Sequence, residues 1–278
     1  DGLQASQSVL ISPDKVTLSF ASSPSGLVLT IDGLPHTTPF VYDTLINFTH
    51  TIEAPNQIAG QTSYTFASWS DAGSQQHTLT VPVAAQAYTA TYTASAVTPP
   101  PGLVAGYRLD EGAGTTTADI SGNAITGTLV NAPAWTTGHY GGALSFGGTN
   151  YVNLANPASL RLTGSMTLSA WINISANPVD DAAIVAKLGS AGWQLKTSLD
   201  TGVRTAAIEI SSNGSDSIQR YGATALTPNT WYHLAGVYDA AARTLTMYVN
   251  GVLDNGLLSG TVPATQFDAP FNVNIAQR

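Results

Sequence analysis

Cysteine is absent from this sequence of 278 residues. The chain therefore has no disulfide bond, no cysteine-ligated zinc or iron–sulfur centre and no thiol nucleophile. Its length still allows one large or two ordinary domains with full hydrophobic cores, because domains of about 100–200 residues do not need such links.

Charge is also scarce: 9% of the residues are charged, and nine Lys and Arg stand against seventeen Asp and Glu. Proteins that bind nucleic acid or an anionic membrane surface need a basic face. Nine cations spread over the chain, at a net charge of −8, are too few to form one. We therefore expect neither nucleic acid nor an anionic lipid surface as a partner.

Long apolar runs are missing as well. No stretch of 18 apolar residues occurs, so no transmembrane helix is expected, and the first residues lack the basic flank and apolar stretch of a signal peptide. A composition rich in Thr, Ser, Gly and Asn is typical of secreted microbial β-proteins, whose sheets are covered by uncharged polar side chains. These features favour an extracellular, monomeric protein that does not insert into membranes.

Three consecutive prolines at positions 99–101 mark the clearest boundary in the chain. Such a run holds a stiff, extended conformation and donates no ladder hydrogen bonds. We therefore predict a small β-sandwich module at residues 1–98, a proline-rich linker at 99–102 and a second domain at 103–278.

Short strand-like runs separated by turn signals fill both parts, and no segment has helical periodicity over more than one turn. Residues 27–31 end at Asp32-Gly33, and residues 244–249 end at Asn250-Gly251, two dipeptides typical of two-residue hairpins. Further strands are predicted at residues 104–109, 166–172 and 231–238. The pattern predicts an all-β protein, a small β-sandwich followed by a larger two-sheet jelly roll.

Four sequence motifs of the second domain occur in a specific order. They are GYRLDEGAG at 106–114 followed by DISGN at 119–123, GGALSFGGTNYV at 141–152, MTLSAWI at 166–172, and WYHLAGVYD at 231–239 with MYVNG at 247–251. In these motifs the domain resembles the bacterial LamG-like, concanavalin A-like jelly-roll family. The first part resembles, more weakly, small β-modules that are appended to secreted bacterial enzymes and lectins.

The resemblance implies a jelly-roll sandwich and a carbohydrate ligand. It also implies a final strand that pairs with the first strand of the domain, whereas this sequence stops at Arg278. Without such a strand, the strand predicted at residues 104–109 would keep an unpaired edge.

Candidate catalytic groups are sparse. Jelly-roll glycosidases place two carboxylates on one strand so that they flank the glycosidic bond. Glu53, Glu111 and Glu209 are isolated here, and no strand carries carboxylates two or four residues apart. The five histidines lack metal-ligand spacing, and no G-x-S-x-G elbow or phosphate-binding loop occurs. We expect no enzymatic activity and keep a glycoside-active enzyme as the third possibility.

The DISGN loop is a candidate site for a structural calcium ion. Asp119 and Asn123 place side-chain oxygens on a glycine-bearing loop, as a hard cation requires, and related jelly rolls often hold one such ion near the first strand. Asp110 and Glu111 are possible further ligands. The alternative is a turn in which Asp119 accepts hydrogen bonds from its own backbone, and the residues leave both readings open.

Aromatic and planar polar side chains are the remaining material for a sugar site, because sugar C–H faces stack on aromatic rings and sugar hydroxyls bond polar groups. We expect Trp69, Trp171, Trp231 and His233 in the cores. Trp193 alternates with Leu195, which places Gln194 and Lys196 on the opposite face of the strand. The candidate ligand-binding residues lie on this outward face and in the adjoining loop: Lys196, Glu209, Asp216, Gln219, Arg220 and Tyr221.

Together these features predict a secreted, non-catalytic protein whose second domain binds a polysaccharide or other glycan, as an adhesion or targeting module. The alternative is a structural or protein-binding module of a larger extracellular protein.

Overall fold

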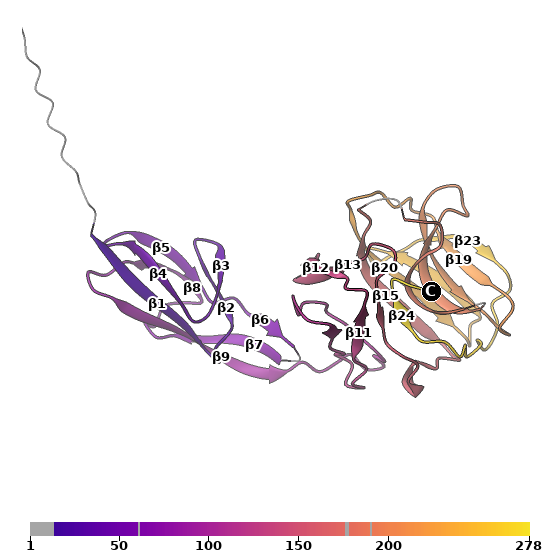
Figure 1. Ribbon diagram of the computed structural model, residues 1–278, viewed down its shortest axis with the longest axis horizontal. Helices are drawn as coiled ribbons and strands as arrows, with labels where there is room; N and C mark the ends of the chain where they lie inside the picture. The colour runs from indigo at the N-terminus through magenta and orange to yellow at the C-terminus, as the bar shows by residue number, and fades with distance from the viewer. Residues whose placement is uncertain (1–13, 61, 176–177, 190) are drawn as a thin grey trace, which may run out of the picture. The chain divides into compact units, whose positions relative to one another are not determined.

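The computed structural model describes residues 14–278 except 61, 176, 177 and 190. The chain divides into two compact units, Asp1–Thr98 and Pro99–Arg278 (Figure 1). The described residues form strands joined by turns, with one short 3-10 turn, η1 (Ala158–Leu160), and no α-helix. The all-β prediction is confirmed.

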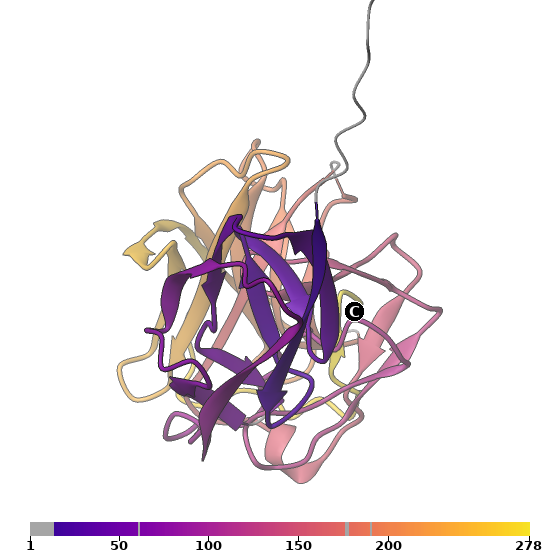
Figure 2. The same ribbon diagram turned by 90° about the vertical axis from the view of Figure 1, so that its left-hand side faces the viewer.

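The N-terminal unit is a sandwich of two sheets, which Figure 2 shows in a second view. The larger sheet contains β4 (Phe40–Leu45), β1 (Lys15–Ser23), β9 (Gln86–Ala96), β7 (Thr62–Trp69) and β6 (Gln57–Ala59) in that order. The smaller one contains β3 (Leu34–Thr37), β2 (Val28–Ile31), β5 (Thr49–Glu53) and β8 (Gln76–Thr80). Leu18, Ile52 and Trp69 belong to the core shared by the two sheets, as predicted for Trp69.

The C-terminal unit is built on a nine-stranded sheet that faces a four-stranded one. The large sheet contains, in spatial order, β10 (Thr116–Thr117), β11 (Gly127–Val130), β14 (Tyr151–Asn153), β24 (Asn274–Ile275), β16 (Ala182–Leu188), β17 (Gly192–Ser198), β18 (Thr205–Ile210), β19 (Ile218–Gly222) and β23 (Asn255–Ser259). The small sheet contains β15 (Met166–Asn173), β20 (Trp231–Asp239), β21 (Thr244–Val249) and β22 (Val252–Leu253). A separate hairpin contains β12 (Ala134–Thr137) and β13 (Gly142–Ser145).

Alternation of apolar side chains explains why these two sheets pack together. Trp193 and Ile208 from the large sheet and Leu234 and Met247 from the small one belong to one buried cluster. Along β20 every second residue is buried, so one face of the strand lies in the core and the other faces outward. The concanavalin A-like sandwich predicted for this unit is confirmed.

The two predicted hairpin turns are present. Asp32 and Gly33 have φ of 51° and 79°, and Asn250 and Gly251 have 51° and 78°. Two successive positive φ angles characterise the two-residue turn whose twist matches that of the flanking strands. This turn brings β21 and β22 into register and thereby ends the small sheet.

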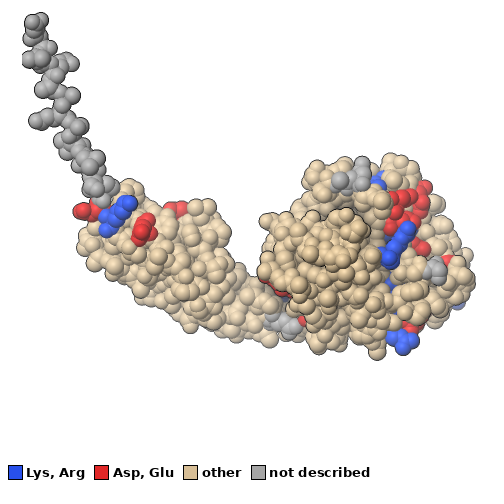
Figure 3. Space-filling view, in the orientation of Figure 1, with Lys and Arg blue, Asp and Glu red and all other residues tan. Residues whose placement is uncertain are grey.

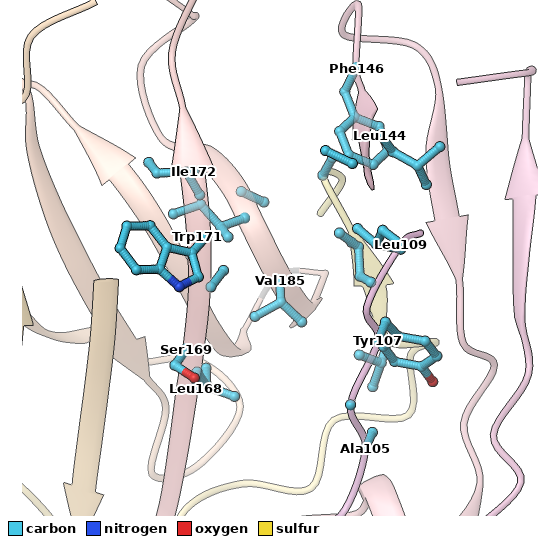
Figure 4. Close-up of a pocket in the computed structure, with 18 of the residues that line it drawn as sticks. Ala105, Tyr107, Leu109, Leu144, Phe146, Leu168, Ser169, Trp171, Ile172 and Val185 are labelled. Atoms are coloured by element: carbon cyan, nitrogen blue, oxygen red, sulfur yellow. The ribbon is translucent and has the colours of Figure 1, made fainter. Parts of the chain in front are cut away.

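The strand predicted at residues 104–109 is not formed. Among the described residues it makes a single bridge, between Tyr107 and Asp119, because no second ladder partner lies beside it. Across from this segment, in the small sheet, β15 is an edge strand, since it pairs with β20 alone in the described part of the sheet. Figure 4 shows the gap between the two, where Leu109 and Tyr107 lie across from Val185. The gap is part of a cavity of about 1930 Å³.

Candidate functional site

A row of side chains that are polar except for one alanine crosses the outer face of the large sheet. Direct cross-strand pairs link its members, and directly paired residues point to the same face. From β14 to β19 the row, here called the polar row, contains Asn153, Asn274, Ala186, Gln194, Glu209 and Gln219. A second row beside it contains Ala183, Lys196, Ala207 and Tyr221.

Four of the six predicted ligand-binding residues therefore share one face. The Lys196 ammonium lies 2.6 Å from Asp181 and 3.3 Å from Glu209. Glu209 also accepts hydrogen bonds from Gln194 at 2.6 Å and from the Ser217 hydroxyl at 2.6 Å. These contacts make a connected network of charged and amide groups over β17, β18 and β19.

This face is more enclosed than the sequence suggested. Lys196 is 1% exposed and Tyr221 is 4% exposed, so the expectation that both side chains face solvent is wrong. The Tyr221 hydroxyl lies 2.7 Å from Asp200 and 2.8 Å from the amide oxygen of Gln219. Neighbouring polar side chains across the strands cover both residues, so they hold the network rather than present a free surface.

Two amide oxygens of the polar row lack a partner. Gln194 Oε1 and Asn274 Oδ1 are buried, and no donor in the described part of the chain lies within hydrogen-bonding distance of either. Both residues pair with Ala186, so the two amides flank the smallest side chain of the row. Two buried acceptors thus lie on either side of Ala186 without a donor from the described residues.

The network also fixes ionisation states. Burial alone would raise the pKa of Asp181, but the hydrogen bond and the charge of Lys196 outweigh it and lower the pKa below its usual range. Burial raises the pKa of the Tyr221 hydroxyl, and its contact with Asp200 raises it further. Asp181 therefore remains an anion and Tyr221 a neutral donor across the physiological range.

Arg220 and Asp216 are not part of this network. Arg220 points to the other side of β19, where its guanidinium donates to the backbone oxygens of Leu245 and Gly256 at 2.9 Å. Asp216 accepts hydrogen bonds from Ser211 and Ser212 in its own loop. Burial opposes ionisation of Asp216, but these hydrogen bonds lower its pKa to about 2. Both residues hold local structure.

The DISGN loop has the geometry of a turn. Asp119 is 4% exposed, and its carboxylate accepts hydrogen bonds from the backbone nitrogens of Gly106, Ser121 and Ile125 and from the Ser121 hydroxyl. Asn123 donates to the Val104 carbonyl, and Glu111 accepts from Thr117 and Ala118. Asp110 is exposed.

A calcium ion does not fit this arrangement, because four donors already point their positive ends at the carboxylate of Asp119. Within the described residues, no group of three or more His, Asp or Glu is placed to hold a metal ion. Calcium binding by this loop stays a prediction, and it would require the turn to open.

An aromatic cluster lies on the outer face of the small sheet and was missed in the sequence. Trp171 on β15 is 40% exposed, so its expected place in the core is wrong. It stacks on His139, with ring centroids 3.9 Å apart and an interplanar angle of 24°, and meets Tyr140 edge-on at 5.6 Å. Trp231 and His233, also expected in the core, are half-buried on the same face of β20.

The signal for this cluster was present in the alternation of β15. Trp171 shares its face with Ser169 and Asn173, whereas Met166 and Leu168 occupy the inward positions. A tryptophan in phase with polar residues points outward. Figure 4 shows its indole directed away from Tyr107 and Leu109.

Charged side chains are sparse on the visible face of the molecule in Figure 3, in keeping with the composition. Where they occur on the C-terminal unit, acidic and basic groups lie next to each other. Within the described ranges, no helix is long and apolar enough to cross a membrane.

Comparisons with known proteins agree with the fold of the C-terminal unit. Residues 146–276 match the family model Laminin_G_3 of the concanavalin A-like lectin/glucanases superfamily, so this stretch is a concanavalin A-like domain. No curated protein matches the chain.

Two solved structures resemble the chain at low identity. One is domain 4 of AbnA, a GH43 extracellular arabinanase from Geobacillus stearothermophilus, solved in complex with arabinotriose, with 18% identity, a TM-score of 0.36, and coverage of 57% of this chain and 85% of the other. The second, from Bacteroides ovatus, is provisionally described as a carbohydrate binding protein, with 12% identity, a TM-score of 0.31, and coverage of 93% and 77%. Likenesses at this level carry no functional conclusion for this chain.

Proposed function

We propose that the C-terminal unit is a non-catalytic carbohydrate-binding module that acts outside the cell, and that the polar row is its ligand face. The carrying observation is the pair of buried, unpartnered amide oxygens of Gln194 and Asn274. Buried polar atoms are almost always hydrogen-bonded, and an unpaired one costs about 1–3 kcal/mol. A glycan supplies several hydroxyl groups in a row, and the half-buried side chains of Glu209 and Gln219 in the same row are open to bond them.

Within the proposed site the residues have different roles. Glu209 and Gln219 are half-buried, so each keeps part of its planar polar group open to a ligand. Lys196 and Tyr221 hold those two side chains in place through the contacts described above. The place of residues 146–276 in a superfamily named for lectins and glucanases supports a carbohydrate as the ligand.

The chemistry of the acidic residues favours binding without hydrolysis. Glycoside hydrolysis needs one carboxyl group with a raised pKa as proton donor and a second carboxylate across the bond. Asp181 and Glu209 both contact the Lys196 ammonium, and the pKa of Asp181 is lowered. Asp181 therefore does not serve as the protonated member that catalysis requires.

A glycan array of neutral and acidic oligosaccharides, followed by isothermal titration with the strongest binder, tests the proposal. Gln219→Ala should weaken binding at least fivefold, because it removes a planar amide from the ligand face. Gln76→Ala is the matched control, since Gln76 is an exposed strand residue of the N-terminal unit. A chain that melts cooperatively but binds no glycan would refute the proposed function.

The alternative function, a protein-binding module, is favoured by the unpaired edge of β15. Free edges accept extended polypeptides through backbone hydrogen bonds. The array separates the two functions, because strand addition needs no glycan.

A further inference from the structure

The aromatic cluster on the small sheet is independent of the polar row. Its strand residues are Trp171 on β15, with His233 and Trp231 on β20, and Trp171 pairs directly with His233. The polar row lies on the outer face of the other sheet, beyond the shared core. A ligand on the aromatic cluster would therefore touch none of the polar-row residues.

The tip of the β12–β13 hairpin completes the cluster. His139 and Tyr140 lie in the turn between these strands, which is closed by a hydrogen bond from the Gly138 nitrogen to the Gly141 carbonyl at 2.9 Å. Gly141 has φ of 66°, and a side chain at Gly138 would lie 2.3 Å from the Gly142 carbonyl oxygen. The two glycines let the turn close tightly, so it carries its two rings to Trp171.

These rings are held in place while remaining accessible. Trp171 contacts His139, Tyr140 and His233 at centroid distances of 3.9, 5.6 and 5.4 Å. Trp171 is still 40% exposed and Tyr140 is 73% exposed. Ring contacts that fix an exposed indole lower the entropy lost when a flat ligand binds to it.

The rim of the cluster determines the chemistry of its ligand. Ser169 and Asn173 flank Trp171 on β15, and Asn250 adjoins His233, whose backbone nitrogen donates to the Asn250 side chain at 2.9 Å. These uncharged polar groups lie on the strand side of the rings, and Asp110 lies beside Gly141 and Gly142 at the hairpin. Along the outward positions of β15 and β20, the nearest Asp, Glu, Lys or Arg is Asp239, at the far end of β20.

We propose that this aromatic platform, formed by His139, Tyr140, Trp171, Trp231 and His233, is a second binding site of the C-terminal unit, for the pyranose rings of a neutral glycan. A pyranose has an apolar C–H face that stacks on an indole and a hydroxyl edge that bonds to side chains such as Asn and Ser. The outward positions of β15 and β20 beside the rings carry no charge, and Asp110 next to the hairpin turn is acidic, so the rim disfavours uronic acids and other anionic sugars. The site shares its ligand class with the proposed function but rests on a different sheet.

Titration of the full chain with cellohexaose, xylohexaose and mannohexaose, followed by calorimetry and tryptophan fluorescence, tests this site. We expect at least one hexasaccharide to bind with a dissociation constant in the micromolar to millimolar range, because a shallow face covers few sugar atoms. Trp171→Ala should weaken that binding at least tenfold, whereas Trp171→Phe, which keeps an aromatic ring, should stay within about threefold of the unmodified chain.

Gln219→Ala distinguishes this site from the polar row. It should leave the Trp171-dependent binding unchanged. If Gln219→Ala lost all hexasaccharide binding and Trp171→Ala bound as well as the unmodified chain, the platform would be overturned and the proposed function would stand. The opposite pattern would establish the platform and refute the polar row.

Hydroxyl-radical footprinting of the unmodified chain keeps the test independent of variant folding. Saturating hexasaccharide should protect Trp171 and Tyr140, and unchanged labelling of both would overturn the proposal. Failure of all three hexasaccharides to bind would do the same. Analytical sedimentation tests whether a second copy of the chain binds this face instead of a glycan. Self-association that Trp171→Ala abolishes would assign the face to that second copy and overturn the proposal.

Discussion

Replacing Lys196 with methionine tests whether the polar network is a buried ion cluster. The change removes the ammonium group but keeps a side chain of similar length at a position that is 1% exposed. Breaking a buried ion pair costs about 3–5 kcal/mol, because the remaining charge is left uncompensated. Asp181 and Glu209 retain 28% and 13% side-chain exposure, so solvent relieves part of this and we expect about 3 kcal/mol at pH 7.

The expected loss depends on pH, and its sign follows from Asp181. In the unmodified chain the lowered pKa of Asp181 stabilises the fold above the ordinary carboxyl pKa, and this contribution disappears as pH falls through the folded value. In Lys196→Met the carboxylate of Asp181 loses the cation that lowers its pKa while its burial remains, so that pKa rises and protonation of Asp181 relieves the unpaired charge. The stability difference between the two proteins should therefore narrow as pH falls from 7 towards 4.

Thermal and urea unfolding at pH 7 and pH 4 measure both effects. A loss of about 3 kcal/mol corresponds to a drop of about 6–12 °C for a unit of this size. Lys15→Met is the matched control, because Lys15 is exposed on the N-terminal unit. An unchanged melting temperature of Lys196→Met at pH 7, or an equal loss at both pH values, would refute the reasoning.

The two remaining predictions concern the core and the DISGN loop. Trp193→Ala should destabilise the C-terminal unit by about 3–5 kcal/mol, because Trp193 is 2% exposed. Trp171→Ala should lower the free energy of unfolding by less than half as much. Equal losses of the two variants in urea unfolding would contradict the outward placement of Trp171. Asp119→Ala should cost about 2–3 kcal/mol with or without calcium, because it removes a charged acceptor of several hydrogen bonds. A calcium-dependent rise of several degrees that chelator reverses and Asp119→Ala abolishes would instead establish an ion in the loop.

The sequence predicted the parts of the fold that depend on local patterns. The Asp32-Gly33 and Asn250-Gly251 turns follow from the backbone freedom of their residues, and the alternation of β20 follows from burial of one face. Residues 104–109 are apolar except for Gly106 and Arg108, as a buried strand would be, yet they do not form a strand. A strand needs a hydrogen-bonding neighbour, and the sequence of the segment itself does not contain that information.

The site was less accessible to sequence reasoning, for two different reasons. The outward position of Trp171 could have been read from Ser169 and Asn173, which share its phase. The burial of Lys196 could not, because it depends on Asp181, which is 15 residues away and enters through a separate strand end. The same holds for Lys187, whose buried ammonium bonds Asp268 from 81 residues away. Contacts of this kind are set by tertiary packing, and residue type alone does not reveal them.

The separation of the two proposed faces has a consequence for how the module would bind. The polar row and the aromatic platform lie on the outward faces of two sheets that share one core, so they point in opposite directions. A short oligosaccharide then occupies one face at a time, and two molecules bind per chain without competing. A long polysaccharide instead meets a bivalent protein, which raises its apparent affinity well above that of either face and lets the chain link two glycan strands. Titration with a hexasaccharide should then give two sites per chain, and Trp171→Ala and Gln219→Ala should each weaken a different one of them while leaving the other unchanged.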